Sequence, residues 1–262
     1  MIMIAFRRRS SITILCVVVL TFLAGCAGLT MFDTPESLMR QGRELYFAKK
    51  YDEAIAKFED VIMKDNTYWL AYVYLARCYI AKNDWFKAIF NARKAYQLSP
   101  GGEDVVPAFA EALLGGGFAA LGKAQFPEAI GNLVEYLRLR PTDARAYLSL
   151  GRAYLGTGAY GDALKAFLNG LTQGDSGARQ ELIQGLLDGG TKALSQGDPR
   201  AAIGLLLEYV RHDPSNLSAF LTLGKAYWQA GERLQALNTF RRVLELNPGN
   251  SEALQFFRGL GR

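Results

Sequence analysis

Few residues of this chain have the types and spacing that chemistry needs, and the clearest spacing is that of a phosphate-binding loop. Gly117, Gly122 and Lys123 are placed as in Gly-x-x-x-x-Gly-Lys, in which backbone N–H groups and a lysine hold phosphates. Ala124 follows where a serine or threonine would hold the metal ion, and the stretch lies inside an expected helix. We therefore expect no phosphate site and interpret the glycine run 115–117 as close helix packing or a weak helix.

The other candidates are a single histidine and Cys78, the one cysteine outside the export-signal-like start of the chain. His212 precedes Asp213 and Pro214, which predicts a cation at the end of a helix, and no second histidine exists to complete a metal site. Cys78 lies in an expected helix and is interpreted as a small buried hydrophobe, the alternative being a reactive thiol. We expect no catalysis, no cofactor and no metal.

The N-terminal segment has the pattern of an export signal. Three arginines at 7–9 precede an apolar run at 12–23, which is shorter than the ~20 residues needed to cross a bilayer. The run ends in Leu23, Ala24, Gly25 and Cys26, which resembles the bacterial lipoprotein box. An ordinary secretory signal with an incidental cysteine is the alternative.

Membership of the lipoprotein class would imply specific processing at Cys26. Residues 1–25 would be removed as a signal peptide, Cys26 would carry diacylglycerol and an acylated N-terminus, and residues 26–34 would form the lipidated tether. Ala27, in place of aspartate, would favour the outer membrane by the sorting pattern of enteric lipoproteins. We therefore expect an outer-membrane lipoprotein that faces the periplasm.

Loss of that segment changes the charge balance. Three of the 30 basic residues and none of the 25 acidic residues lie in it, so 27 basic and 25 acidic residues remain. A nearly balanced charge provides no electrostatic footprint for a polyanion, and we expect no nucleic-acid partner. Cys78 would be the only free thiol, which excludes an intramolecular disulfide.

The rest of the chain shows a repeated pattern of small residues, and the helices that this pattern predicts must position any binding residues. Alanines recur at nearly regular intervals, each twelve places after a small residue in a preceding helix. The alanines are Ala54, Ala88, Ala129, Ala163, Ala202 and Ala236. The small residues are Gly42, Ala76, Gly117, Gly151, Gly190 and Gly224. Three of the intervals, including the one from Ala54 to Ala88, are 34 residues long. A period of about 34 residues is typical of repeats built from paired helices, so the pattern indicates a helical repeat array.

These residues and their spacing resemble tetratricopeptide repeats. The resemblance implies an all-α fold, a right-handed α-solenoid of about six helix-turn-helix repeats with a C-terminal capping helix. The repeats are expected near 35–68, 69–102, 110–143, 144–177, 183–216 and 217–250, within a solenoid over 35–262 whose cap is 251–262. Repeats five and six resemble a copy of three and four, in which Ala129 matches Ala202 and Ala163 matches Ala236. Extra residues lie at 101–107 and 174–179, where they could alter the superhelix or extend a helix.

Members of this family bind partners along the concave face made by the first helices. Carried over, the fifth, ninth and twelfth places of the repeats would form a groove with an apolar floor and scattered cations. The partner-binding residues predicted are Met39, Arg43, Tyr46, Val73, Arg77, Ile80, Leu114, Phe118, Leu148, Arg152, Leu155, Leu187, Leu221, Lys225 and Trp228. Such a groove suits a peptide with apolar side chains and a few carboxylates. The alternative is that the stripe completes the core or packs against itself.

Two aromatic residues open the second helix of repeat two. Trp85 occupies a place that is aromatic in other repeats and is interpreted as packing, whereas Phe86 has no such counterpart and is a candidate exposed contact.

The sequence therefore predicts a lipid-anchored scaffold that binds a protein or peptide in a bacterial envelope assembly or secretion machine. Among lipoproteins of this build, it is similar to the six-repeat pilotins of type IV pilus secretins and, less closely, to the tetratricopeptide lipoprotein of β-barrel assembly. Alternatives are a recruiter of cell-wall or polysaccharide-export enzymes, or a groove filled by the chain itself with binding through the convex face.

Overall fold

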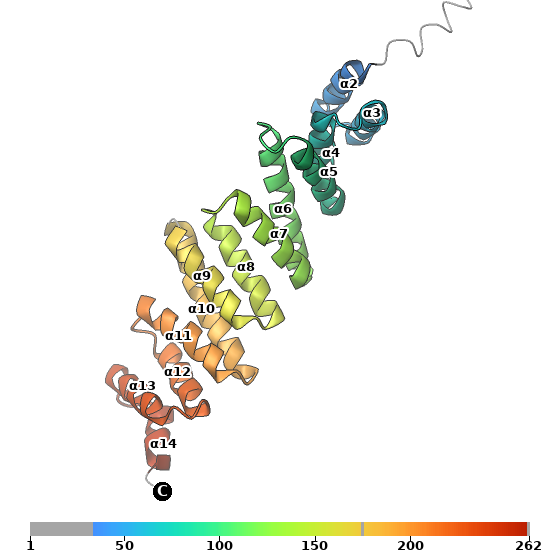
Figure 1. The fold of residues 1–262 in the computed structure, drawn as a ribbon. Coiled ribbons are helices and arrows are strands. Elements are labelled where there is room, and N and C mark those ends of the chain that lie inside the picture. The colour runs from blue at the N-terminus through green and yellow to red at the C-terminus, as the bar shows by residue number, and fades with distance from the viewer. Residues whose placement is uncertain (1–33, 174–175, 261–262) are drawn as a thin grey trace, which may run out of the picture. The chain divides into compact units, whose positions relative to one another are not determined.

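The computed structural model describes residues 34–173 and 176–260, without the side chains of Ser176 and Leu260 (Figure 1). The expected signal peptide, Cys26 and the tether up to residue 33 lie outside the described residues. Within them the chain forms thirteen helices and no strands, which confirms the all-α repeat fold. The helices are α2 (Pro35–Phe47), α3 (Tyr51–Lys64), α4 (Trp69–Ala81), α5 (Trp85–Leu98), α6 (Val105–Gly122), α7 (Phe126–Leu139), α8 (Ala144–Thr157), α9 (Tyr160–Gln173), α10 (Ser176–Ser195), α11 (Pro199–His212), α12 (Leu217–Gln229), α13 (Arg233–Leu246) and α14 (Ser251–Leu260).

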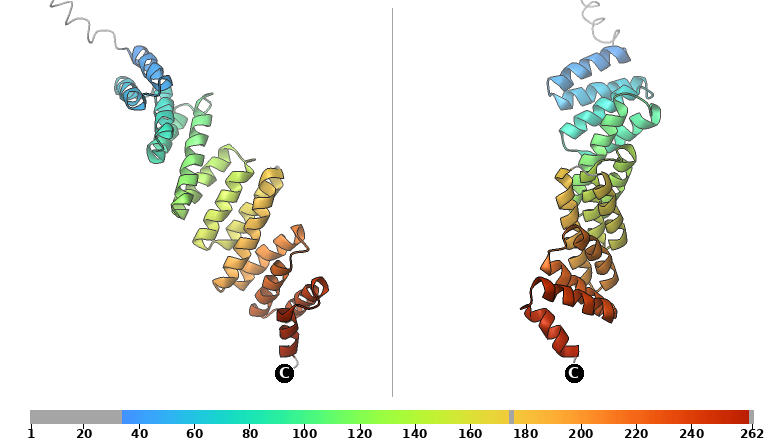
Figure 2. Two further views of the ribbon diagram at one scale, coloured as in Figure 1. Left: turned by 180° about the vertical axis from the view of Figure 1, so that it is seen from behind. Right: turned by 90° about the vertical axis from the view of Figure 1, so that its left-hand side faces the viewer.

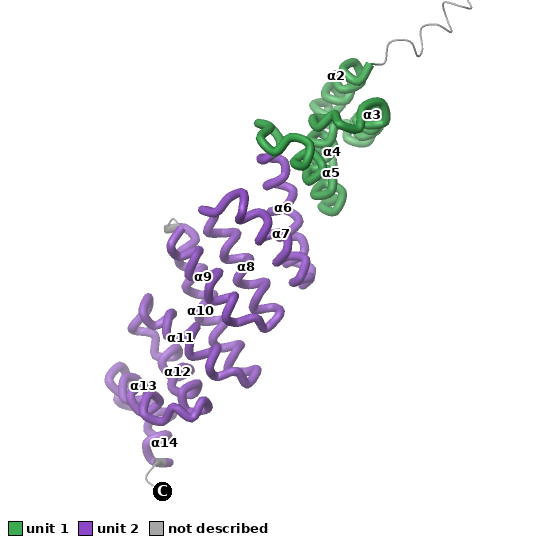
Figure 3. The backbone as a smooth tube through the Cα atoms, in the orientation of Figure 1, with its two compact units in different colours: residues 1–105 green, residues 106–262 purple. Residues whose placement is uncertain are grey.

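The helices group into two compact units, divided at Val105 (Figure 3). Unit 1 holds α2 to α5, and unit 2 holds the helices from α6 onward. The two helices of a repeat pack against each other, as α8 does with α9 and α10 with α11 in unit 2 (Figure 2). First helices α6 and α10 begin before the repeats expected at 110 and 183, because the extra residues at the joints extend these helices.

Each turn between the paired helices contains one residue with a left-handed backbone, always five places before the alanine of the repeat pattern. Glycine takes this place three times, at Gly158, Gly197 and Gly231. The other three repeats use residues with side chains, namely Lys49 (φ 60°), Asn83 (φ 57°) and Ala124 (φ 56°). Left-handed geometry costs most residues with a Cβ about 1–2 kcal/mol, and asparagine tolerates it better, so the turns at Lys49 and Ala124 carry local strain. Ala124, considered above for a phosphate loop, belongs to such a turn.

In five repeats, the glycine of the first helix lies against a large side chain of the second. A Cβ built on Gly42 would stand 2.5 Å from Phe58, and one on Gly151 would stand 2.3 Å from Phe167. In repeat two the corresponding residues are Ala76 and Ala92, and both are fully buried. The recurring small residue therefore leaves room for the side chain of the second helix that packs against it.

Hydrogen bonds join successive repeats at two equivalent places. Tyr136 at the end of α7 donates to Asp143 Oδ2 at 2.7 Å, while Oδ1 of Asp143 caps α8. Burial, followed by this hydrogen bond, raises the pKa of Tyr136 to about 12. Tyr209, the counterpart of Tyr136 in repeat five, accepts from Asn216 Nδ2 at 2.7 Å, and Asn216 caps α12. The connection from repeat three to repeat four and the connection from repeat five to repeat six are thus stabilised by equivalent tyrosine hydrogen bonds.

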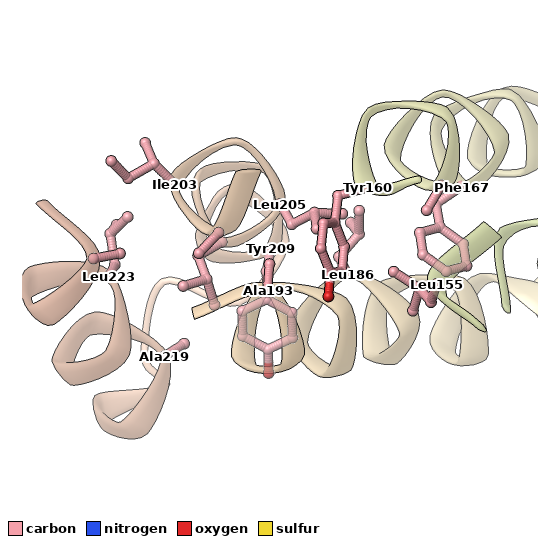
Figure 4. Packing of buried hydrophobic residues seen from close by; sticks show 14 of the residues in the cluster. Leu155, Tyr160, Phe167, Leu186, Ala193, Ile203, Leu205, Tyr209, Ala219 and Leu223 are labelled. Atoms are coloured by element: carbon pink, nitrogen blue, oxygen red, sulfur yellow. The ribbon is translucent and has the colours of Figure 1, made fainter. Parts of the chain in front are cut away.

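The core of unit 2 runs through its repeats. Leu155 of α8, Phe167 of α9, Leu186 of α10 and Leu205 of α11 pack into one buried cluster (Figure 4). Helix α6 is the one described helix whose length and composition would also fit a membrane span, and half of that stretch is buried in the protein. Such burial is what a core helix of a repeat array shows.

Candidate functional site

The first helices of successive repeats lie beside one another, α2 with α4 in unit 1 and α10 with both α8 and α12 in unit 2. The predicted fifth-place residues mostly face neighbouring helices. Met39, Val73 and Leu148 are buried, so the structure does not offer these side chains to a partner. Leu114, Leu187 and Leu221 are half-buried. Half of the predicted apolar floor is therefore buried in the folded chain, and the other half remains partly accessible.

The twelfth places are more varied. Leu155 is buried, Tyr46 and Ile80 are half-buried, and the side chain of Trp228 is 42% exposed. The indole of Trp228 makes an edge contact with Phe256 of α14, at 5.0 Å between ring centroids.

The ninth places are the most accessible part of the predicted set. Arg43, Phe118, Arg152 and Lys225 are exposed, and Arg77 is half-buried. The accessible surface of the first helices is therefore cationic and aromatic, with less apolar area than the sequence suggested.

The cations of repeats two, four and six are each paired with an acid from the segment that follows their own repeat. Arg77 lies 2.6 Å from Asp104 and Lys225 lies 2.6 Å from Glu252, whereas Arg152 and Glu181 are 3.6 Å apart. These acids could not be predicted from the repeat pattern, because Asp104 and Glu181 lie in or next to the irregular joints between repeats and no place of the pattern marks them. A partner carboxylate must displace these acids or approach a guanidinium beside them.

Unit 1 contains a compact group of two guanidinium groups around one aromatic ring. The guanidinium carbon of Arg43 lies 5.6 Å from the ring centroid of Tyr74, and that of Arg77 lies 5.3 Å from it. Tyr46 completes the group through an edge contact with Tyr74, at 5.5 Å. Arg43 is exposed, and among the ion pairs of the described residues none involves it. The group therefore carries one guanidinium whose charge no carboxylate of the described chain offsets.

The last repeat is closed by the chain itself. Lys225 and Trp228 line a small hollow together with Glu252 and Phe256 of α14. Helix α14 thus occupies the place of a next first helix and covers part of the predicted site at this end.

The residues that the sequence offered for chemistry, namely Gly117, His212 and Cys78, have structural roles in the fold. Gly117 lies within α6, and a Cβ on it would stand 2.8 Å from Leu133 Cγ, so close packing explains this glycine. His212 ends α11, with its Nε2 at 3.5 Å from Glu208. Cys78 is fully buried, and burial, then the charge of Asp52, raises the pKa of its thiol to about 12. Across the described ranges, no three His, Cys, Asp or Glu side chains gather in a way that could hold a metal ion.

Comparisons with known proteins agree with this architecture. Models of the tetratricopeptide repeat match residues 46–90, 116–178 and 193–256, and the chain belongs to the tetratricopeptide repeat family. No curated protein sequence matches it significantly.

Solved structures share the fold at low sequence identity. The chain resembles a structure of Naa15/Naa10 bound to HypK-THB, with a TM-score of 0.52 and 17% identity, over 84% of this chain and 33% of that one. YrrB, described as a tetratricopeptide protein with an unusual peptide-binding site, has 17% identity and a TM-score of 0.39, over 85% of this chain and 91% of that one. PilW, a type IV pilus biogenesis factor, has 18% identity and a TM-score of 0.38, over 85% and 98%. At these identities the likenesses show the fold alone, and the family defines the chain as a scaffold for protein–protein interaction.

Proposed function

We propose that this chain is a lipid-anchored scaffold of the bacterial envelope, attached through Cys26 to the outer membrane and facing the periplasm. Its first helices bind a protein or peptide partner of an envelope assembly or secretion machine. Leu-Ala-Gly-Cys at 23–26, after a basic and apolar leader, supports the anchor. No catalytic role is proposed.

The group around Tyr74 carries the binding proposal. Arg43 is exposed and without an acidic partner among the described residues, and it is held beside an aromatic ring, which favours a guanidinium position suited to a carboxylate. Arg77 adds a second guanidinium but already bonds Asp104. We infer that the partner presents a carboxylate to Arg43 and an apolar side chain to the half-buried edge of Tyr46.

Charge reversal at Arg43 tests the partner site. In cells, the Arg43→Glu lipoprotein is crosslinked beside the wild type and a Lys64→Glu control, which makes the same change of charge on the exposed end of α3. The proposal expects an envelope protein that the wild type and the control capture and that the Arg43 variant loses. Equal capture by all three would exclude the Tyr74 group as the binding site.

A separate substitution tests the anchor. Cys26→Ser should abolish lipid labelling and release the protein from membranes while its helical content stays the same, because α2 begins at Pro35. Unchanged membrane attachment of this variant would refute the lipid anchor.

A further inference from the structure

The outer side of α5 exposes two phenylalanines one helical turn apart. Phe86 is 80% exposed and Phe90 is 62% exposed. They lie opposite the buried side of the helix, which contains Ala88, Ala92 and Ala95. The proposed binding of a partner by the first helices leaves this surface without a role.

The repeat architecture does not require aromatic residues at these two places. The corresponding residues are Asp52 and Ala56, Pro127 and Gly131, Gly161 and Lys165, Arg200 and Gly204, and Leu234 and Asn238. A Cβ added to Gly131 or Gly161 would meet no atom within 4 Å, and one added to Gly204 would meet only Leu164, at the ordinary contact distance of 3.5 Å. The aromatic pair belongs to repeat two alone, and packing within a repeat does not explain it.

Exposed large apolar side chains are concentrated in unit 1. Of the seven in the described residues, four lie in this shorter unit, namely Phe47, Met63, Phe86 and Phe90. Of the three in unit 2, Phe118 and Trp228 belong to the predicted partner-binding set, and Leu234 lies alone on α13. The unit that follows the N-terminal segment therefore has the more apolar surface.

Helix α5 combines this pair with positive charge. Residues 85–98 include Lys87, Arg93 and Lys94 and no acidic residue. Lys94 follows Phe90 by one turn, on the same side of the helix. Lys87, by contrast, pairs with Asp84 at 3.7 Å. Aromatic side chains followed by a lysine on the same side of a helix are typical of helices that lie in a membrane interface.

We propose that the outer face of α5, formed by Phe86, Phe90 and Lys94, rests in the interface of the anionic membrane to which Cys26 holds the chain. This inference rests on the proposed anchor. The eight peptide steps from Cys26 to Thr34 reach at most about 30 Å, which keeps unit 1 near the lipid surface. Two phenylalanines bury too little apolar area to hold a protein on a membrane by themselves, but the tether makes their contact with the membrane intramolecular.

The test uses the lipidated protein in vesicles of phosphatidylethanolamine and phosphatidylglycerol. A polarity-sensitive fluorophore is attached at Gln97→Cys, an exposed position two turns past Phe90 on the same side of α5. The control attaches it at Glu245→Cys, the equivalent and also exposed position of α13. Cys78 does not compete for the label, because it is buried.

The expected result is emission at shorter wavelength from position 97 and loss of most of its fluorescence when the lipids carry an acyl-chain nitroxide. The probe at 245 should show neither change. In the Phe86→Ser/Phe90→Ser background the probe at 97 should behave like the control, while circular dichroism shows unchanged helix content.

Each other outcome overturns the inference in its own way. If the probes at 97 and 245 show the same emission and the same quenching, the outer face of α5 does not contact the membrane and would be assigned to a protein partner. Quenching at 97 that persists after the serine substitutions would show that residues other than Phe86 and Phe90 make the membrane contact. Self-quenching at 97 that dilution with unlabelled protein relieves would assign the face to a second copy of the chain. A protein without lipid label at Cys26 would refute the anchor itself, and the membrane contact with it.

Discussion

At the level of single residues, some turns between paired helices place a residue with a side chain in a backbone conformation that favours glycine. Ala124 adopts the left-handed geometry that Gly158 adopts in the next repeat, with φ values of 56° and 78°. The same turn is therefore built with and without a Cβ in one molecule.

Replacing Ala124 with glycine should stabilise the protein. Relief of about 1–2 kcal/mol of left-handed strain outweighs the extra flexibility of glycine in the unfolded chain, which costs about 0.4–1 kcal/mol. Thermal unfolding measures the change, and Gly158→Ala, which introduces the strain, should shift the midpoint in the opposite direction. A lower midpoint for Ala124→Gly would show that the methyl group contributes packing that exceeds its strain.

Cys78 should be unreactive in the folded protein. With its pKa raised to about 12, the thiol is almost entirely protonated at pH 8, and the thiolate is the reactive form. Alkylation by iodoacetamide, followed by mass spectrometry, should be much slower in the native protein than in denaturant. A Gln97→Cys variant supplies an exposed thiol for comparison, and similar rates at the two positions would contradict the burial of Cys78.

At the level of helix pairs, glycines in similar helices differ in whether a neighbouring side chain occupies the place of a Cβ. Gly151 in α8 touches Phe167, whereas the place of a Cβ on Gly131 in α7 is empty. Only the position within the repeat distinguishes a packing glycine from one that merely weakens its helix.

Alanine at these two glycines should give free-energy changes of opposite sign. Gly151→Ala overpacks a fully buried ring and should cost about 1–3 kcal/mol. Gly131→Ala should stabilise by up to about 1 kcal/mol, because alanine favours a helix interior over glycine. Urea unfolding followed by circular dichroism compares the two variants, and a shared sign would indicate that helix propensity alone governs these positions.

At the level of the complete chain, an array of repeats needs an end, and α14 supplies it in unit 2. Phe256 stacks on Phe240 with ring centroids 4.1 Å apart, and Glu252 pairs with Lys225. Without α14, the last repeat would expose a face that other repeats bury against a neighbour.

Truncation after Asn250 should therefore destabilise the C-terminal repeats and expose Phe240, which is only 3% exposed in the full chain. The expected results are a lower unfolding midpoint and increased binding of a dye that detects apolar surface. Arg258→Ala, on the exposed side of α14, should leave both unchanged. If the truncated chain behaves like the wild type, α14 does not cap the array.

The family, the helix pairs and the places of close packing were predictable from the sequence, since a periodic pattern of small and large residues directly records contacts within each repeat. The exposure of the predicted groove depends instead on how the repeats pack in three dimensions. Val73 and Leu148 are buried in the folded chain, and a helical stripe looks the same in sequence whether a neighbouring helix or solvent lies over it. The pairing of Arg77 with Asp104 likewise depends on how an irregular joint folds back, which no periodic signal encodes.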